Sequence, residues 1–210
     1  MLDRGPAHPP TLPWYHLADP AVAVPARFVA ALAPLDPHVL HLTVMCPVAS
    51  LGEEALDELA SQGAARLSGQ PIPKPSRLPA PLAFDLAPAP SDREVTLEAQ
   101  LGELLSGVES RVHAVDAGVF HGYLTTVLVQ CRARLTADHV RGLVRAAEGF
   151  RMARRGESLT TTRAVEQGTT VVCGGLRIEG GWVSAWLLAD GLAVGGARAV
   201  LEIVRSFSAC

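Results

Sequence analysis

Two adjacent glycines, Gly180 and Gly181, separate two runs of strand-forming residues at 169–179 and 182–188. A two-residue hairpin turn of the common primed types needs positive φ angles, and glycine adopts them without a steric penalty. The pattern therefore predicts a β-hairpin, which is an antiparallel pair of strands. An antiparallel or mixed sheet suits such a chain better than a doubly wound parallel sheet.

Further strands and helices can be predicted from the spacing of the apolar residues. Strands are expected at 38–48, 111–119 and 124–135, with a short one near 83–86, and helices at 21–35, 53–67, 91–108, 136–147 and 194–207. Ser50 with Glu53 and Ser91 with Glu94 have the spacing of capping boxes, and Thr136 is a candidate N-cap. We predict an α+β fold, with a mixed, largely antiparallel sheet and helices packed on one face.

The other face of this sheet needs a cover, because the chain is rich in apolar residues. A second copy of the chain is the simplest cover, since a twofold contact uses one patch twice. Trp182 and Trp186 lie four residues apart and therefore share one face of a strand, where core or dimer interface is a more common role than a ligand cage. We expect a homodimer that forms through this face.

Composition limits the classes of partner. The 210 residues include 18 Lys and Arg against 21 Asp and Glu, a net charge of -3, which gives no basic field to attract nucleic acid. Apolar residues make up 49% of the chain and charged residues 19%, as in globular proteins rather than disordered ones. We expect a globular protein with no nucleic-acid partner.

The first 20 residues are rich in proline and predict an irregular arm before a domain at 21–210. They lack the apolar run of a signal peptide, and no apolar run reaches the roughly 20 residues of a membrane span. The cysteines lie far apart, without the paired spacing of a zinc site: Cys46, Cys131, Cys173 and Cys210. We expect a cytoplasmic protein with reduced thiols, no bound metal and no membrane contact.

Several short motifs, taken in their order and spacing, resemble the aspartate-semialdehyde dehydrogenase family and its Usg-type relatives over residues 18–205. The strongest is D-G-L-A-V-G-G-A at 190–197, where the family has D-N-L-x-K-G-A-A at the start of its last helix. Weaker matches are V-A-S-L-G at 48–52, A-P-L-A-F-D at 80–85 and V-F-H-G at 119–122. The resemblance implies the C-terminal dimerisation domain of these enzymes.

The family's enzymes bind their dinucleotide through a separate domain with a glycine-rich turn. No G-x-G-x-x-G follows a predicted strand in this sequence, so the phosphate-binding turn is not found. We therefore expect a dimerisation-like domain without the dinucleotide-binding domain, and no cofactor.

The family attacks its aldehyde substrate with a cysteine thiolate in the motif N-P-N-C. That motif aligns with D-P-A-V at 19–22, so Val22 takes the position of the nucleophile and cannot act as one. The glutamine that orients the substrate aligns with Cys46. A buried, inert thiol is the preferred interpretation of Cys46 over a replacement nucleophile, because the sequence shows no cationic neighbour that would lower its pKa.

The family's R-x-P-V-x-x-G-H motif supplies an arginine for the substrate carboxylate and a histidine as acid and base. It aligns with D-A-G-V-F-H-G-Y at 116–123. Asp116 would repel a carboxylate, and Tyr123, with a reference pKa of about 10, is a poor proton shuttle at neutral pH. His121 could replace the base. It lies two positions before Tyr123, however, and so would reach a different depth of the substrate pocket, and a structural role is the preferred interpretation.

The family's E-E-x-K segment contributes a substrate-binding glutamate and a phosphate-binding lysine. It aligns with R-E-V-T at 93–96, so Arg93 reverses the sign of the first glutamate and the lysine is replaced. The candidates for a remaining substrate cleft are Arg93, Asp116, His121 and Tyr123. The replaced positions together predict no route to the family's reaction.

Three functions are compatible with these residues. The favoured one is a non-catalytic homodimeric module that serves assembly or binds a separate protein partner. The second is one component of a split or divergent NADP-dependent semialdehyde dehydrogenase, completed by another chain. The third is a sensor that binds a small metabolite in the remodelled substrate cleft.

Overall fold

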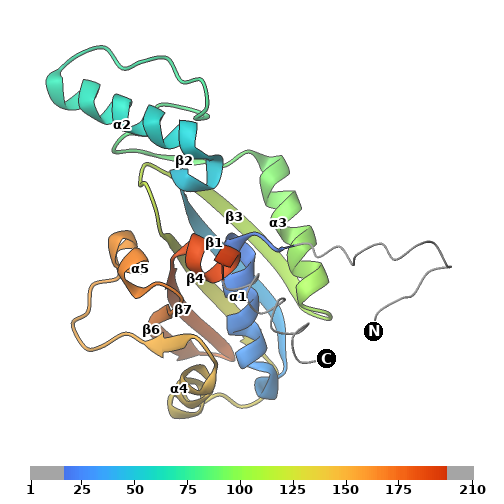
Figure 1. The fold of residues 1–210 in the computed structure, drawn as a ribbon. Coiled ribbons are helices and arrows are strands. Elements are labelled where there is room, and N and C mark those ends of the chain that lie inside the picture. Colours follow the sequence, from blue (N-terminus) through green and yellow to red (C-terminus); the bar gives the residue numbers. More distant parts are fainter. Residues whose placement is uncertain (1–16, 198–210) are drawn as a thin grey trace, which may run out of the picture.

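The computed structural model describes residues 17–197, and seven strands of this part form one mixed sheet in the order β2-β3-β1-β4-β7-β6-β5 (Figure 1). The strands are β1 (Pro37–Pro47), β2 (Leu86–Pro88), β3 (Glu109–Ala117), β4 (Tyr123–Cys131), β5 (Phe150–Met152), β6 (Val171–Glu179) and β7 (Trp182–Ala189). The pairs β1–β3 and β5–β6 are parallel, and the other four pairs are antiparallel. The predicted α+β class, with a mixed and largely antiparallel sheet, is confirmed.

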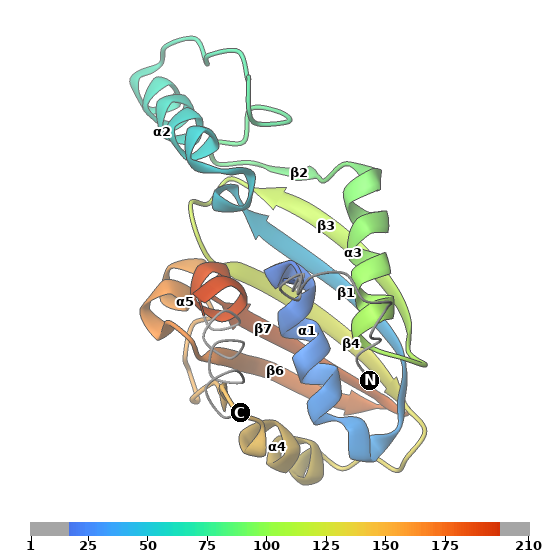
Figure 2. The same cartoon turned by 45° about the vertical axis from the view of Figure 1, so that its right-hand side comes forward.

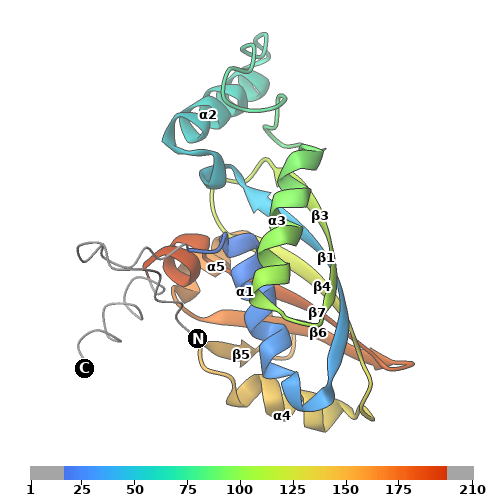
Figure 3. The ribbon, with the colours of Figure 1, turned by 90° about the vertical axis from the view of Figure 1, so that its right-hand side faces the viewer.

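Three helices cover one face of the sheet: α1 (Pro20–Ala31), α3 (Ser91–Leu104) and α4 (Ala137–Ala146) (Figures 2 and 3). Side chains alternate between the two faces along a strand, and Leu40, Leu42 and Val44 of β1 are buried on the helix side. The helix α1 is apolar nearly all round, as expected of a helix in the middle of a core. This layer contains the main hydrophobic core.

The short helix α5 (Thr161–Gln167) covers one corner of the opposite face. Its buried Ala164 packs against Val172 and Leu188. These two residues alternate along their strands with Val171 and Leu187, which belong to the main core, so they point away from α1. The rest of this face carries no helix among residues 17–197.

A small lobe extends from one end of the sheet (Figures 1 and 3). It consists of α2 (Glu53–Ser68) and the following chain, and it has its own apolar cluster, which includes Leu59, Leu78 and Leu82. The side chain of Gln62 is fully buried, and its Oε1 accepts hydrogen bonds from the backbone N–H groups of Leu82, at 2.9 Å, and Ala83, at 3.3 Å. A buried amide thus fixes the returning chain against the helix.

The uncovered part of the sheet, called the open face below, is built from alternate residues of the four central strands. The strand registers place these side chains on it: Val39, His41, Thr43 and Met45; Arg111 and His113; Thr126, Leu128 and Gln130; Trp182, Ser184 and Trp186. The two tryptophans share this face, as predicted, opposite Gln130 and Thr126. Its use for dimerisation stays a prediction.

The hairpin is confirmed, because Gly180 and Gly181 join β6 to β7 with φ angles of 55° and 85°. The Thr136 hydroxyl caps α4 by accepting from the His139 N–H at 3.3 Å. Both predicted capping boxes are wrong: α2 and α3 form, but no side chain caps either helix. The short strand lies at Leu86–Pro88 rather than at 83–86.

The predicted helix at 194–207 lies largely outside the described residues, whose last element is the π-helical turn η3 (Leu192–Ala197). Most of the predicted arm, residues 1–16, also lies outside them. Within residues 17–197 no helix is long and apolar enough to cross a membrane.

Candidate functional site

A cavity of about 500 Å³ opens where the first turn of α1, the end of β1, the turn before β4 and the start of η3 meet. Two glycines, Gly191 just before η3 and Gly195 within it, allow η3 to lie close to the other walls of the cavity. A Cβ on Gly191 would clash with the ring of Tyr123, and one on Gly195 would clash with Pro20. Gly191 and Gly195 of the motif at 190–197 therefore allow this segment to pack closely against Tyr123 and Pro20 in the cavity wall.

Asp19 and Pro20 line this cavity, but Val22 does not. Asp19 is the N-cap of α1: its Oδ1 accepts from the Ala21 N–H at 2.8 Å, and its own N–H donates to Gln100 Oε1 at 2.9 Å. Val22, one turn further, has no exposed surface and belongs to the main core. The position that aligns with the family's nucleophile is thus an apolar side chain inside the core.

Cys46, near the end of β1, is also buried, with 1% of its surface exposed. Burial raises the pKa of its thiol to about 12, although the nearby positive charge of Arg93 acts in the opposite direction. The expectation that no cation lies near this thiol is therefore wrong. The inert thiol is nevertheless the better interpretation, because desolvation outweighs the charge and the reactive thiolate does not form.

Arg93 of α3 and Asp116 of β3, both predicted cleft residues, do not line this cavity. They form an ion pair, with 2.8 Å between Arg93 Nη1 and Asp116 Oδ1. The Asp116 side chain is only 3% exposed and that of Arg93 is 19% exposed. Burial raises the pKa of Asp116, while the charge and hydrogen bond of Arg93 lower it. The two cleft candidates therefore satisfy each other, and neither presents a free charge.

Ser50 connects this ion pair to the cavity. Its Oγ accepts from Arg93 Nη2 at 3.2 Å and donates to the Pro47 carbonyl oxygen at 2.7 Å. A serine whose proton is directed to a carbonyl oxygen has no base to activate it as a nucleophile. Ser50 therefore acts as a polar link in the wall of the cavity.

Tyr123 and His121 both line the cavity, at different depths. Tyr123 is 6% exposed, and burial raises the pKa of its phenol further above the ordinary value. His121 is exposed at the mouth. The structure thus brings both side chains to one cavity, with the difference in depth that their spacing predicts.

Comparison with known proteins places this geometry in a family context. In sequence, the chain is 29% identical over 197 residues to the "USG-1 protein homolog" of Pseudomonas aeruginosa. The aligned region covers 83% of this chain and 57% of that protein. It is 33% identical over 136 residues to the "USG-1 protein homolog" of Azotobacter vinelandii. This aligned region covers 58% of this chain and 40% of that protein. No family model matches the chain.

The solved structures extend the match to the fold. Aspartate-semialdehyde dehydrogenase II from Vibrio cholerae superposes with a TM-score of 0.83 at 20% identity, over 90% of this chain and 60% of that one. A probable aspartate-semialdehyde dehydrogenase from Pseudomonas aeruginosa gives a TM-score of 0.76 at 27% identity, over 86% and 59%. The resemblance to the aspartate-semialdehyde dehydrogenase family is confirmed. The chain spans 57% of the length of the Pseudomonas USG-1 homolog.

In the alignment that the motif resemblance implies, the charges of Arg93 and Asp116 are exchanged relative to those of the family. The family's motifs have a glutamate at the position of Arg93 and an arginine at the position of Asp116. Here each sign is reversed, and the two side chains are in direct contact at 2.8 Å. A simultaneous reversal keeps the summed charge of the cluster but places the cation on α3 instead of the sheet.

Asp19, Ser50 and Asp190 were not among the predicted site residues, although all three line the cavity. The sequence offered a signal for each of them, since all three lie in motifs that carried the resemblance: Asp19 in D-P-A-V at 19–22, Ser50 in V-A-S-L-G at 48–52 and Asp190 at the start of the motif at 190–197. Ser50 was interpreted as a helix cap, which hid its role in the cavity wall. Within residues 17–197 no group of His, Cys, Asp and Glu side chains is arranged to hold a metal ion.

Proposed function

We propose that this chain is a non-catalytic, homodimeric relative of the semialdehyde dehydrogenases, kept for assembly or for binding a partner protein in the cytoplasm. The observation that carries the proposal is the complete burial of Val22, the residue that the motif resemblance aligns with the family's nucleophile. The family's chemistry needs a thiolate that attacks the aldehyde carbon. The neighbouring thiol of Cys46, with a pKa of about 12, is no replacement for it.

The open face supports the homodimer. Leu128 at its centre is 39% exposed, and Trp182 and Trp186 lie beside it on β7. Large aromatic side chains on a partly exposed surface are enriched at protein interfaces. A hollow of about 610 Å³ next to Leu128, Trp182 and Ser184 offers room for side chains of a second copy.

A location in the cytoplasm is supported by the thiols. Cys46, Cys131 and Cys173 are free and buried, as is usual for proteins of reducing compartments.

The enzymatic part of the proposal is tested with the full chain, NADP, aspartate semialdehyde and inorganic phosphate. We expect no reduction of the nicotinamide above the rate without protein, because the nucleophile is replaced. Reduction that depends on the protein would contradict the proposal and would favour a divergent enzyme. Reduction that appears only after a second, dinucleotide-binding chain is added would favour the split enzyme.

A metabolite sensor is the second candidate, because the cavity keeps a built polar wall. Asp19, Ser50, His121, Tyr123 and Asp190 line it, and Ser50 is held from behind by a hydrogen bond from Arg93, which is paired with Asp116. A small ligand that binds only the folded chain would raise its melting temperature. Thermal denaturation with a panel of amino acids and semialdehydes distinguishes the two: a concentration-dependent rise supports the sensor, and no change supports the non-catalytic module.

A further inference from the structure

A second cavity, of about 340 Å³, lies away from the candidate site, between β5, the loop that follows it and α5. Its walls are unusually rich in arginine. The residues that line it are Arg151, Arg154, Arg155, Gly156, Glu157, Arg163 and Gln167. Four arginines and one glutamate thus line the same cavity.

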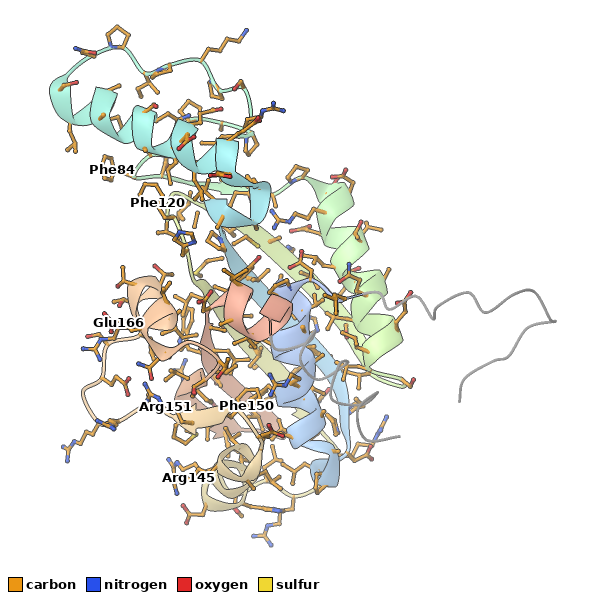
Figure 4. The ribbon with its side chains drawn as sticks, viewed as in Figure 1. Phe84, Phe120, Arg145, Phe150, Arg151 and Glu166 are labelled. Carbon is orange, nitrogen blue, oxygen red and sulfur yellow. The ribbon has the colours of Figure 1, made fainter. Side chains whose placement is uncertain are left out.

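Arg151 and Glu157 are paired in the wall of this cavity. Arg151 Nη1 and Nη2 donate to the two carboxylate oxygens of Glu157 at 2.9 and 2.5 Å, and its Nε and Nη2 donate to Gln167 Oε1 at 3.1 and 2.9 Å. Such a two-pronged pair fixes the plane of the guanidinium group. Figure 4 shows Arg151 in this region, between α5 and the helix α4 that carries Arg145.

Glu157 also holds the loop in place. Its Oε2 accepts from the Arg154 backbone N–H at 2.7 Å, and its Oε1 lies 4.0 Å from Arg163 Nη1. These contacts hold the pKa of this carboxyl at about 2, with the bonds from Arg151 as the largest cause. The loop is therefore shaped before any ligand arrives.

Three positive charges remain after Glu157 balances one arginine. The side chain of Arg163 is 50% exposed, and Arg154 and Arg155 are exposed. Glu157 is the only acidic residue in the wall among the described residues. Glu166, exposed on α5, does not line the cavity (Figure 4).

We infer that this arginine cavity binds a small molecule that carries phosphoryl groups. Guanidinium forks match the oxygens of a phosphoryl group in pairs, and three surplus charges exceed what a single carboxylate would balance. The cavity falls within the range of small-molecule pockets and is larger than one phosphate ion requires. A diphosphate or a phosphorylated metabolite therefore fits better than free phosphate alone.

The test is isothermal titration of the full chain with pyrophosphate, inorganic phosphate and a sugar phosphate, at constant ionic strength set with sodium chloride. We expect saturable binding of pyrophosphate or the sugar phosphate at one site, tighter than that of inorganic phosphate. Binding of inorganic phosphate alone, or of none of the three, would overturn the inference. So would binding of an oligonucleotide but of none of these small ligands.

Matched variants locate the site. Arg163→Gln and Arg154→Gln should each weaken pyrophosphate binding about tenfold, which is one strong charge-assisted contact. Arg145→Gln removes the same charge from the exposed end of α4, outside the cavity, and should leave the affinity unchanged within about twofold. Equal losses in all three variants would mean that only net charge matters, and the inference would be wrong.

A charge-conserving variant separates recognition from attraction. Arg163→Lys keeps the positive charge but loses the planar fork, so it should weaken binding nearly as much as Arg163→Gln. Full affinity in Arg163→Lys would contradict a built phosphoryl site. Circular dichroism confirms that each variant is folded, which is expected because these side chains are exposed or half-exposed.

Discussion

Arg93 and Asp116 are the residues in which the departure from the semialdehyde dehydrogenase motifs is easiest to recognise as a coordinated change. A reversal at one of the two positions alone would have placed two like charges next to each other in a mostly buried cluster, which is costly. Both positions are reversed, and they are bonded at 2.8 Å. We therefore expect the cluster to have a structural role in its present form.

We predict that Arg93→Ala lowers the free energy of unfolding by about 3 kcal/mol, because Asp116 would stay buried without its partner. Asp116→Ala and the double variant complete a cycle in which the double change costs less than the sum of the single ones. Urea denaturation measures all three. The control is Arg111→Ala, which breaks an exposed pair with Glu109 and should cost at most about 1 kcal/mol. Equal costs for Arg93→Ala and Arg111→Ala would contradict this role.

Glu157 gives a prediction for acid stability. Its pKa in the folded chain is about 2, below the ordinary value of 4.5, so the unfolded chain binds the proton more readily. Stability from Glu157 is present above pH 4.5 and is lost as the pH falls toward 2. The difference in melting temperature between the unaltered chain and Glu157→Gln should therefore shrink over this interval. A difference that does not change with pH would contradict the assignment.

At the scale of elements, α3 protects the edge of the sheet. The strand β2 pairs only with the end of β3, at Val115 to Ala117. The backbone N–H groups of Val112 and Ala114, further back on the same edge, donate to Glu98 Oε1 at 2.9 Å and to Glu94 Oε1 at 2.8 Å. Two carboxylates one turn apart thus satisfy the amides that a second chain could otherwise pair with.

Glu94→Ala should destabilise the fold by about 1–3 kcal/mol, because it leaves the Ala114 N–H without its acceptor. Hydrogen exchange, followed residue by residue, should accelerate at Ala114. Glu103→Ala, an exposed change on the same helix, is the control and should leave exchange at Ala114 unaltered. Protection of Ala114 that persists in Glu94→Ala would show that the carboxylate is not needed.

Local sequence signals predicted the elements whose causes are local. The hairpin at Gly180 and Gly181 and the Thr136 cap formed as expected. The capping boxes failed because the side chains bind other groups: Ser50 donates to the nearby Pro47 carbonyl oxygen and accepts from the distant Arg93, and Glu94 accepts from the distant Ala114 N–H. Propensity in a short window contains no information about such long-range competition.

The elements β5 and α5 were missed for a related reason. Phe150–Met152 and Thr161–Gln167 are short and are flanked by a basic loop. The strand exists because it pairs with β6, and the helix exists because Ala164 packs on Val172 and Leu188. Neither has enough periodic residues to be recognised alone.

For the candidate site, the motif resemblance predicted residues that the fold brings close together. Arg93, Asp116 and Cys46 interact directly or electrostatically, and Tyr123 and His121 line the adjacent cavity. The partnership of Arg93 with Asp116 and the role of Ser50 could not be predicted, since both depend on how α3 packs against the end of the sheet.

The whole molecule is a sheet with one covered face and one largely open face (Figure 3). Leu128, Trp182 and Trp186 place large apolar side chains near the middle of the open face, with His41 and Ser184 on either side of Leu128, while Arg111 and His113 lie toward its β3 edge. Large aromatic side chains among polar ones are common in protein interfaces. We therefore expect a second copy of the chain to cover this centre.

Sedimentation velocity of the full chain tests the homodimer most directly. We predict a species of twice the chain mass of 22.1 kDa at micromolar concentration, and a monomer for Leu128→Asp, which places a charge at the centre of the open face. Val95→Asp makes the same kind of change on the exposed surface of α3 and should stay a dimer. A monomeric unaltered chain, or a Leu128→Asp variant that is folded and still dimeric, would contradict dimerisation through the open face.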